Sequence, residues 1–309
     1  GHPHAITGSN DNSVRVWNLT TGTQTHHLTG HTSGVNAVAA TRINGHPHAI
    51  TGSNDNSVRV WNLTTGTQTH HLTGHTDWVK SVAVTPINGR PHTVTGSDDS
   101  SVRVWDLTTG TQTHHLTGHT SVVRSVAVTP INGRPHAVTG SNDRSVRVWD
   151  LTIGAEIRTR TGHFGGVNAV AVTRINGHPH AATGSNDRSM RVWDLTTGTQ
   201  THHLTGHTSG VNAVAATRIN GHPHAITSSN DRSMRVWDLT TGAEIRTLTG
   251  HTSWVRSVAV TRIKGRPHAV TGCTDGSVRV WDLTTGAEIR TLTGHTDWVK
   301  SVAVTRIKG

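Results

Sequence analysis

The sequence predicts an all-β protein built from seven copies of one four-stranded unit. A pattern that begins at Gly1 restarts every 44 residues without an insertion, and its seventh copy ends at residue 308. Turn-forming residues arrive about every 8 to 12 residues, which is typical of antiparallel strands, and no segment keeps the period of a helix. We expect residues 1–309 to form one domain. The copies begin at Gly1, Gly45, Gly89, Gly133, Gly177, Gly221 and Gly265.

Each copy contains four short segments with strand character. "VNAVAAT" (35–41) alternates and is mostly apolar, and "HAIT" (48–51) follows an "INGHP" turn. "SVRVWN" (57–62) follows the turn-forming "SND", and the polar "TQTHHLT" (67–73) follows "TTG". Because polar side chains discourage edge-to-edge pairing, we expect the Thr- and His-rich strand at the outer edge and the Val- and Ala-rich strand innermost.

The chain is basic, with 28 Lys and Arg against 18 Asp and Glu and a formal net charge of +10. Such a surface favours acidic partners without naming one. Protonation of the 26 His would add further positive charge, so we expect acid to destabilise the fold. The single cysteine, Cys273, excludes an internal disulfide framework.

Nothing in the sequence resembles a signal peptide or a membrane span, which favours a cytoplasmic protein without a membrane partner. The residues also show no unique acid/base pair, phosphate-binding loop or metal cluster. The sequence therefore predicts a protein that is not an enzyme and that carries no cofactor.

Two short motifs recur in every copy, namely Gly-His and, further along, Trp-Asp or Trp-Asn. On these motifs the whole chain resembles the WD-repeat β-propeller family, in particular its highly repetitive bacterial members. The resemblance implies seven four-stranded blades around a central channel. Asn18 and Asn62 replace the usual Asp, and "TRINGHP"-like loops replace the usual turn after the innermost strand. The Trp residues of the second motif are Trp17, Trp61, Trp105, Trp149, Trp193, Trp237 and Trp281.

The two ends of the chain complement each other in this architecture. The chain begins with a second strand, "HPHAIT", and ends with a spare innermost strand, "WVKSVAVT" (298–305). Pairing of these segments would complete the first blade and remove two exposed strand edges. We therefore predict that the C-terminal strand closes the ring by pairing with the three N-terminal strands.

The resemblance also implies a structural network in each blade, which joins the His of Gly-His, a Ser or Thr, the turn Asp and the Trp. A Ser/Thr–His–Asp grouping also occurs in nucleophilic catalysis, but sevenfold repetition and burial favour a structural role. The sets carried over by position are His31, Thr51, Asp55 and Trp61; His75, Thr95, Asp99 and Trp105; and, from both chain ends, His295, Thr7, Asp11 and Trp17.

Positions that differ between copies are better clues to a partner. Two of them, just after "GHT" or its equivalent, carry Trp and Lys or Arg in blades 7, 1 and 3, and Gly and Asn in others. Trp and Arg are enriched at binding hot spots, so we expect this face to bind an acidic or aromatic-containing protein or peptide. The alternative is that the Trp rings pack on neighbouring loops. The candidate residues are Trp254, Arg256, Trp298, Lys300, Trp78, Lys80 and Arg124.

Other functions fit the pattern less well. The Arg residues are spread around the ring and few aromatics remain for base stacking, which argues against nucleic acid. Equivalent His on successive blades are too far apart to share one metal ion, so no metal site is predicted. We expect a monomer. The alternatives to an interaction scaffold are a designed or purely structural propeller without an evolved ligand, and a weak binder of polyanions.

Overall fold

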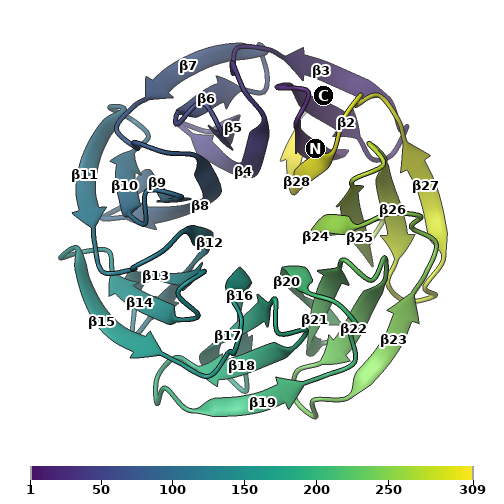
Figure 1. Cartoon of the computed structure of the whole chain (residues 1–309). Helices are drawn as coiled ribbons and strands as arrows, with labels where there is room; N and C mark the ends of the chain where they lie inside the picture. The colour runs from purple at the N-terminus through teal and green to yellow at the C-terminus, as the bar shows by residue number, and fades with distance from the viewer. Residues whose placement is uncertain (1, 308–309) are drawn as a thin grey trace.

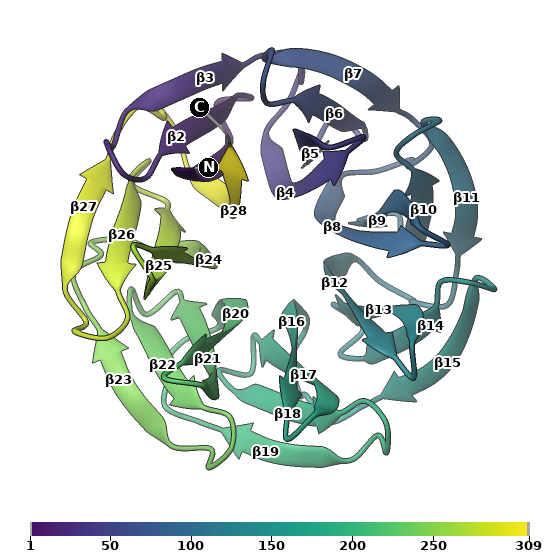
Figure 2. The ribbon, with the colours of Figure 1, turned by 180° about the vertical axis from the view of Figure 1, so that it is seen from behind.

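The Val- and Ala-rich segments form the inner strands of seven antiparallel sheets, which stand around a central channel (Figure 1). The structure is a computed structural model that describes residues 2–307. Each sheet has four strands, and the seven blades form a closed ring, as predicted (Figure 2). Among the described residues, no helix is long and apolar enough to cross a membrane.

The inner two strands of each blade are the longest. The innermost strands of blades 2 to 7, in order, and then of blade 1 are β4 (Val35–Ile43), β8 (Val79–Ile87), β12 (Val123–Ile131), β16 (Val167–Ile175), β20 (Val211–Ile219), β24 (Val255–Ile263) and β28 (Val299–Ile307). The second strands are β1 (His2–Ser9), β5 (His46–Ser53), β9 (Arg90–Ser97), β13 (Arg134–Ser141), β17 (His178–Ser185), β21 (His222–Ser229) and β25 (Arg266–Cys273).

The outer two strands are shorter. The third strands are β2 (Val14–Asn18), β6 (Val58–Asn62), β10 (Val102–Asp106), β14 (Val146–Asp150), β18 (Met190–Asp194), β22 (Met234–Asp238) and β26 (Val278–Asp282). The outer strands are β3 (Gln24–Leu28), β7 (Thr67–Leu72), β11 (Thr111–Leu116), β15 (Ala155–Arg160), β19 (Gln200–Leu204), β23 (Glu244–Leu248) and β27 (Glu288–Leu292). The polar strands lie on the rim, as expected from their side chains (Figure 1).

The first hairpin of each blade extends further than the sequence predicted. In blade 2, Asn44 and Gly45 have φ angles of 49° and 79°, the left-handed conformation of both central residues in a type I′ turn. Its twist matches that of the strands, so pairing continues up to Ile43 and His46, the residues that flank the turn. Both strands are therefore longer than the apolar segments that predicted them.

The hydrophobic core lies between the blades. One cluster joins Ile6 and Val16 of blade 1 to Val35 and Trp61 of blade 2, and equivalent clusters occupy the other six interfaces. Burial of these side chains is the main stabilising contribution, at about 1.5–3 kcal/mol each. The core therefore depends on every blade having neighbours on both sides.

The ring is closed by strands from opposite ends of the chain. β28 pairs antiparallel with β1, from His2 opposite Ile307 to Ser9 opposite Val299. Blade 1 consequently has the order β28-β1-β2-β3, and Figure 1 shows the yellow β28 in the same blade as the purple β2 and β3. The predicted closure is confirmed.

Candidate binding site

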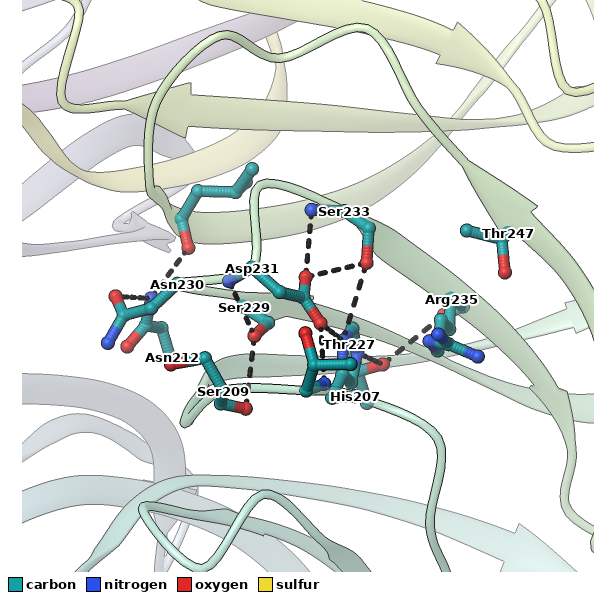
Figure 3. Close-up of polar contacts among 12 residues, drawn as sticks. His207, Ser209, Asn212, Thr227, Ser229, Asn230, Asp231, Ser233, Arg235 and Thr247 are labelled. Atoms are coloured by element: carbon teal, nitrogen blue, oxygen red, sulfur yellow. Dashed lines mark hydrogen bonds and ion pairs between the residues drawn. The ribbon is translucent and has the colours of Figure 1, made fainter.

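A polar network lies beneath the loops at one end of each blade, and Figure 3 shows it in blade 6. His207, from the loop before β20, bonds Asp231 through Nδ1 at 2.7 Å and Thr227 through Nε2 at 2.8 Å. The indole of Trp237 donates to the same Thr227 hydroxyl at 2.9 Å. Each buried polar group thereby has a partner.

In each of the three sets named from the sequence, the four side chains meet in the same way. Their imidazole Nδ1 atoms lie 2.8–2.9 Å from the carboxylate, and their Nε2 atoms lie 2.7 Å from the hydroxyl. Each indole donates to that hydroxyl at 2.9–3.0 Å. The hydroxyls are fully buried, so the arrangement organises the loops and offers no open nucleophile. The sets are His31, Thr51, Asp55 and Trp61; His75, Thr95, Asp99 and Trp105; and His295, Thr7, Asp11 and Trp17.

Two serines belong to each of these networks, and the sequence analysis missed them. In blade 1, the Ser13 hydroxyl donates to Asp11 Oδ1 at 2.6 Å, and the Ser9 hydroxyl accepts from the Asp11 backbone N–H at 3.2 Å. The signal in the sequence was the recurring spacing Ser-x-Asp-x-Ser, as in "SNDNS". These serines hold the aspartate in the orientation that meets the histidine.

Burial and hydrogen bonding set the charges of the network. Burial alone would raise the pKa of Asp11, but hydrogen bonds from Ser13 and His295 outweigh it and hold the pKa at about 2. Burial lowers the pKa of His295 despite the nearby carboxylate. The network therefore consists of a carboxylate and a neutral imidazole at neutral pH.

Two exposed Trp residues lie at the same end of the ring, above blades 7 and 1. Trp254 precedes β24 and Trp298 precedes β28, with 44% and 38% of their surfaces exposed. The guanidinium of Arg256 lies 5.4 Å from the Trp254 ring and 5.7 Å from the Trp298 ring, within cation–π range of both. We call these three residues the Trp arc.

Blade 3 carries a separate pair of the same kind. Lys80 lies 4.2 Å from the ring centre of Trp78, whose surface is 45% exposed. Lys80 also lies 3.4 Å from Asp98. Among residues 2–307, no cation–π pair joins Trp78 to the Trp arc, so two of the three predicted Trp residues share Arg256 and the third pairs with Lys80.

The mouth of the central channel is lined by one residue from the start of each inner strand. These residues surround a cavity of about 310 Å³ together with Asn186 and Asn230. Four are cationic and three are amides, so the mouth presents many hydrogen-bond donors. In chain order they are Asn36, Lys80, Arg124, Asn168, Asn212, Arg256 and Lys300.

The cations at the mouth repel one another. Burial, followed by the charges of Lys80 and Arg256, lowers the pKa of Lys300 to about 8. Burial also lowers the pKa of Lys80, although Asp98 opposes the shift. An anion at the mouth would relieve this repulsion, because an opposite charge favours the protonated amine.

The arc across blades 5 and 6 has a different character. The side-chain amides of Asn168 and Asn212 donate to Asn186 and Asn230 at 2.7 and 2.8 Å. The amide N–H groups of these two residues are therefore already hydrogen-bonded within the protein. The exposed Phe164, with 82% of its surface accessible, is the large apolar residue on this side.

The recurring histidines of the second strands form hydrogen bonds with the backbone. His4 and His48 are buried, and each bonds through Nδ1 to the carbonyl oxygen two residues earlier, at 3.0 and 2.9 Å. Each blade contains one such histidine, and these side chains do not meet at a common point.

Blade 7 departs from the common network. His251 Nε2 lies 3.0 Å from the Thr271 hydroxyl, but its buried Nδ1 has no hydrogen-bond partner among the described residues. Asp275 instead accepts from the Thr252 hydroxyl at 3.3 Å. Cys273 stands where the other blades have serine, and burial raises its pKa to about 11 and lowers that of His251 to about 4. The signal in the sequence was "CTDGS" in place of "SNDNS".

Comparison with curated proteins finds no match. Comparison with protein families finds six matches to the family described as WD domain, G-beta repeat, at residues 22–62, 66–106, 110–150, 154–194, 198–238 and 242–282. Each match runs from the start of an outer strand to the third strand of the next blade, so the seventh repeat is the one that the chain ends divide. The matched residues make up more than half of the sequence, and propellers of this kind are generally noncatalytic scaffolds that bind proteins or peptides. The chain belongs to the WD domain, G-beta repeat family.

Proposed function

We propose that this propeller is a noncatalytic scaffold that binds an acidic peptide segment containing an aromatic side chain. The observation that carries the proposal is the Trp arc, in which Arg256 lies between two exposed indoles from neighbouring blades. Large exposed aromatics beside a fixed cation are typical of binding hot spots. The expected site comprises Trp254, Arg256, Trp298, Lys300, Trp78, Lys80 and Arg124.

The channel mouth supplies the preference for negative charge. Lys300, Arg256, Lys80 and Arg124 surround one cavity, and Asp98 lies 3.4 Å from Lys80. A carboxylate at the mouth would gain hydrogen bonds from cations and reduce their repulsion. An aromatic side chain of the same peptide would then pack between the Trp rings of the arc.

The Gly- and Asn-rich side of the mouth explains why the site is lopsided. Asn168 and Asn212 bond their neighbours, and Gly166 and Gly210 occupy the positions of the Trp residues. At the mouth, this side offers amides in place of cations and small residues in place of Trp. A peptide is therefore expected to lie across blades 7 and 1.

A displayed library of random peptides tests the proposal and needs no assumption about the identity of the partner. We expect the protein to enrich acidic peptides that contain an aromatic residue. The double substitution Trp254→Ala and Trp298→Ala should weaken binding of an enriched peptide at least about 30-fold, the equivalent of about 2 kcal/mol. Phe164→Ala is the matched control, because it removes an exposed aromatic from the opposite side of the ring.

Two results would contradict the proposal. Failure to enrich any peptide would favour a purely structural propeller. Equal binding by the double variant, with a steep loss of affinity as salt rises, would indicate nonspecific attraction of polyanions to the basic surface. The melting temperature of the double variant should stay near that of the original chain, because both Trp residues are exposed at the surface and lie outside the buried core.

A further inference from the structure

We propose that blade 7 contains a zinc site formed by His251 Nδ1, Cys273 Sγ and a carboxylate oxygen of Asp275. The three potential ligand atoms all lie within 4.8 Å of one another. They come from the loop before β24, the end of β25 and the turn that follows it. The site is independent of the proposed peptide binding, although Trp254 belongs to the same loop as His251.

The strongest observation is the unpartnered imidazole nitrogen. His251 is 7% exposed, and its Nδ1 has no hydrogen-bond partner among residues 2–307. In blade 6, the equivalent atom of His207 lies 2.7 Å from Asp231. A buried polar atom without a partner destabilises the fold, so a ligand that bonds to this nitrogen would remove that penalty.

The other side of the imidazole is arranged as it is in metal sites. His251 Nε2 lies 3.0 Å from the Thr271 hydroxyl, which also receives the indole N–H of Trp281 at 3.1 Å. With the proton on Nε2, the imidazole donates to Thr271 and presents the Nδ1 lone pair toward Cys273 and Asp275. A hydrogen bond on the second nitrogen typically fixes the tautomer and ring orientation of a ligating histidine.

A local change in sequence creates the cluster. Serine at the position of Cys273 accepts a hydrogen bond from the backbone of the turn aspartate in other blades, as Ser53 does for Asp55 at 3.1 Å. A thiol is a weak hydrogen-bonding group. In blade 7 the Asp275 carboxylate accepts hydrogen bonds from the Thr252 and Ser277 hydroxyls and forms none with the His251 imidazole. The result is a thiol, an imidazole and a carboxylate around one point.

The chemistry of the three groups selects the ion. Sulfur, nitrogen and oxygen ligands together suit Zn²⁺, which they bind at about 2.0–2.3 Å. A tetrahedral site then needs its ligand atoms roughly 3.3–3.6 Å apart, a change that rotation of the exposed Asp275 and of the Cys273 side chain accommodates. Water completes the fourth position, and the thiol releases its proton to solvent on binding.

One nearby cation opposes the site. Arg279 lies 3.9 Å from Asp275 Oδ2 and 3.0 Å from Glu288. Glu288 offsets part of its charge, and the Arg279 side chain is partly exposed to solvent. Zn²⁺ therefore competes with Arg279 for one oxygen of Asp275, and the thiolate supplies the decisive ligand.

The test compares the original chain with Cys273→Ser, both prepared without an affinity tag and treated with a chelator. The variant keeps every histidine and restores the serine of the other six blades, so it retains the fold and any weak surface binding of metal. Zinc titration by calorimetry should show one tight site per chain. The substitution should weaken that site more than about 100-fold, beyond the 10–100-fold typical of outer-shell changes.

Cobalt provides a second readout that is specific for sulfur. Co²⁺ bound by the original chain should show a near-ultraviolet charge-transfer band from the thiolate, and this band should be absent in Cys273→Ser. Zinc should also raise the melting temperature of the original chain more than that of the variant. Identical zinc titrations for the two chains, or bound cobalt without the thiolate band, would overturn the proposal.

Discussion

Blades 1 and 7 contain the same four network side chains, yet only one of the two networks is complete. Blade 1 takes His295 from one end of the chain and Asp11 from the other, and their side chains meet at 2.9 Å. In blade 7, His251 and Asp275 are 24 residues apart in the chain, but no hydrogen bond joins them. Distance along the chain therefore matters less than the residue that orients the aspartate.

The orienting residue differs by one atom. Ser9 accepts from the backbone of Asp11 at 3.2 Å and donates to the carbonyl of Asp297 at 3.2 Å. Cys273 replaces this oxygen with a larger and more weakly bonding sulfur. Where "CTDGS" replaces "SNDNS" in a nearly identical repeat, a satisfied network thus gives way to a cluster with an open ligand.

Acid should have the largest effect, because it acts on both networks. The pKa of Asp11 is about 2 in the folded chain, below its unfolded value, so its stabilising contribution is present above about pH 4 and is lost as the pH falls to 2. His295 and His251 have folded pKa values below 6.5. The unfolded chain therefore takes up protons first, and stability falls as the pH decreases below 6.5.

The shift at His251, from 6.5 to about 4, is worth about 3 kcal/mol between these pH values. We expect the melting temperature in metal-free buffer to fall between pH 7 and pH 4.5. His251→Gln should reduce this fall, because glutamine does not titrate. An unchanged melting temperature over this range, or an equal fall in the variant, would contradict the lowered pKa of His251 in the folded chain.

Removal of the network histidine should lower the free energy of unfolding by different amounts in blades 1 and 7. His295→Ala leaves Asp11 and Thr7 without their partner, and we expect it to lower the free energy of unfolding by about 2–4 kcal/mol. His251→Ala should cost about 1–2 kcal/mol less, because its Nδ1 bond is already missing. Urea denaturation at neutral pH with a chelator present measures both changes. Equal losses would show that the blade 7 network is complete in solution.

A smaller effect is expected at Ser228, where blade 6 packs against blade 7. Ser228 is fully buried and its hydroxyl has no partner among the described residues, whereas the other copies have glycine there. At Gly8 of blade 1, an added Cβ would lie 2.6 Å from Val35. Ser228→Gly should therefore stabilise the protein by about 1 kcal/mol, after the entropy cost of glycine is included.

The opposite change in blade 1, Gly8→Ser, is the matched control and should destabilise the protein. Urea denaturation of both variants gives the comparison. A loss of stability in Ser228→Gly would mean that the Ser228 hydroxyl finds a partner, such as a buried water, in solution.

The sequence by itself determined the number of blades, the order of strands and the closure between β28 and β1. The number of repeats and the strand order follow from local patterns, since alternation, turn residues and a constant period act on neighbouring positions. The arrangement of the repeats in a ring that the end strands close follows from the resemblance to WD-repeat propellers. The network partners followed from the resemblance to WD-repeat propellers, whose motif residues match this sequence position by position. Ser13 beside Asp11 was missed although the spacing Ser-x-Asp-x-Ser recurs, because the spacing alone does not show that the hydroxyl points toward the carboxylate.

Only the tertiary structure decided which side chains meet between and within blades. Arg256 lies between Trp254 and Trp298 because the curvature of the ring brings two loops together, and Trp78 stays apart. His251 has an open Nδ1 beside the turn in which "CTDGS" replaces "SNDNS". Such contacts depend on packing at the scale of single atoms, and repetition of a 44-residue pattern carries no information on that scale.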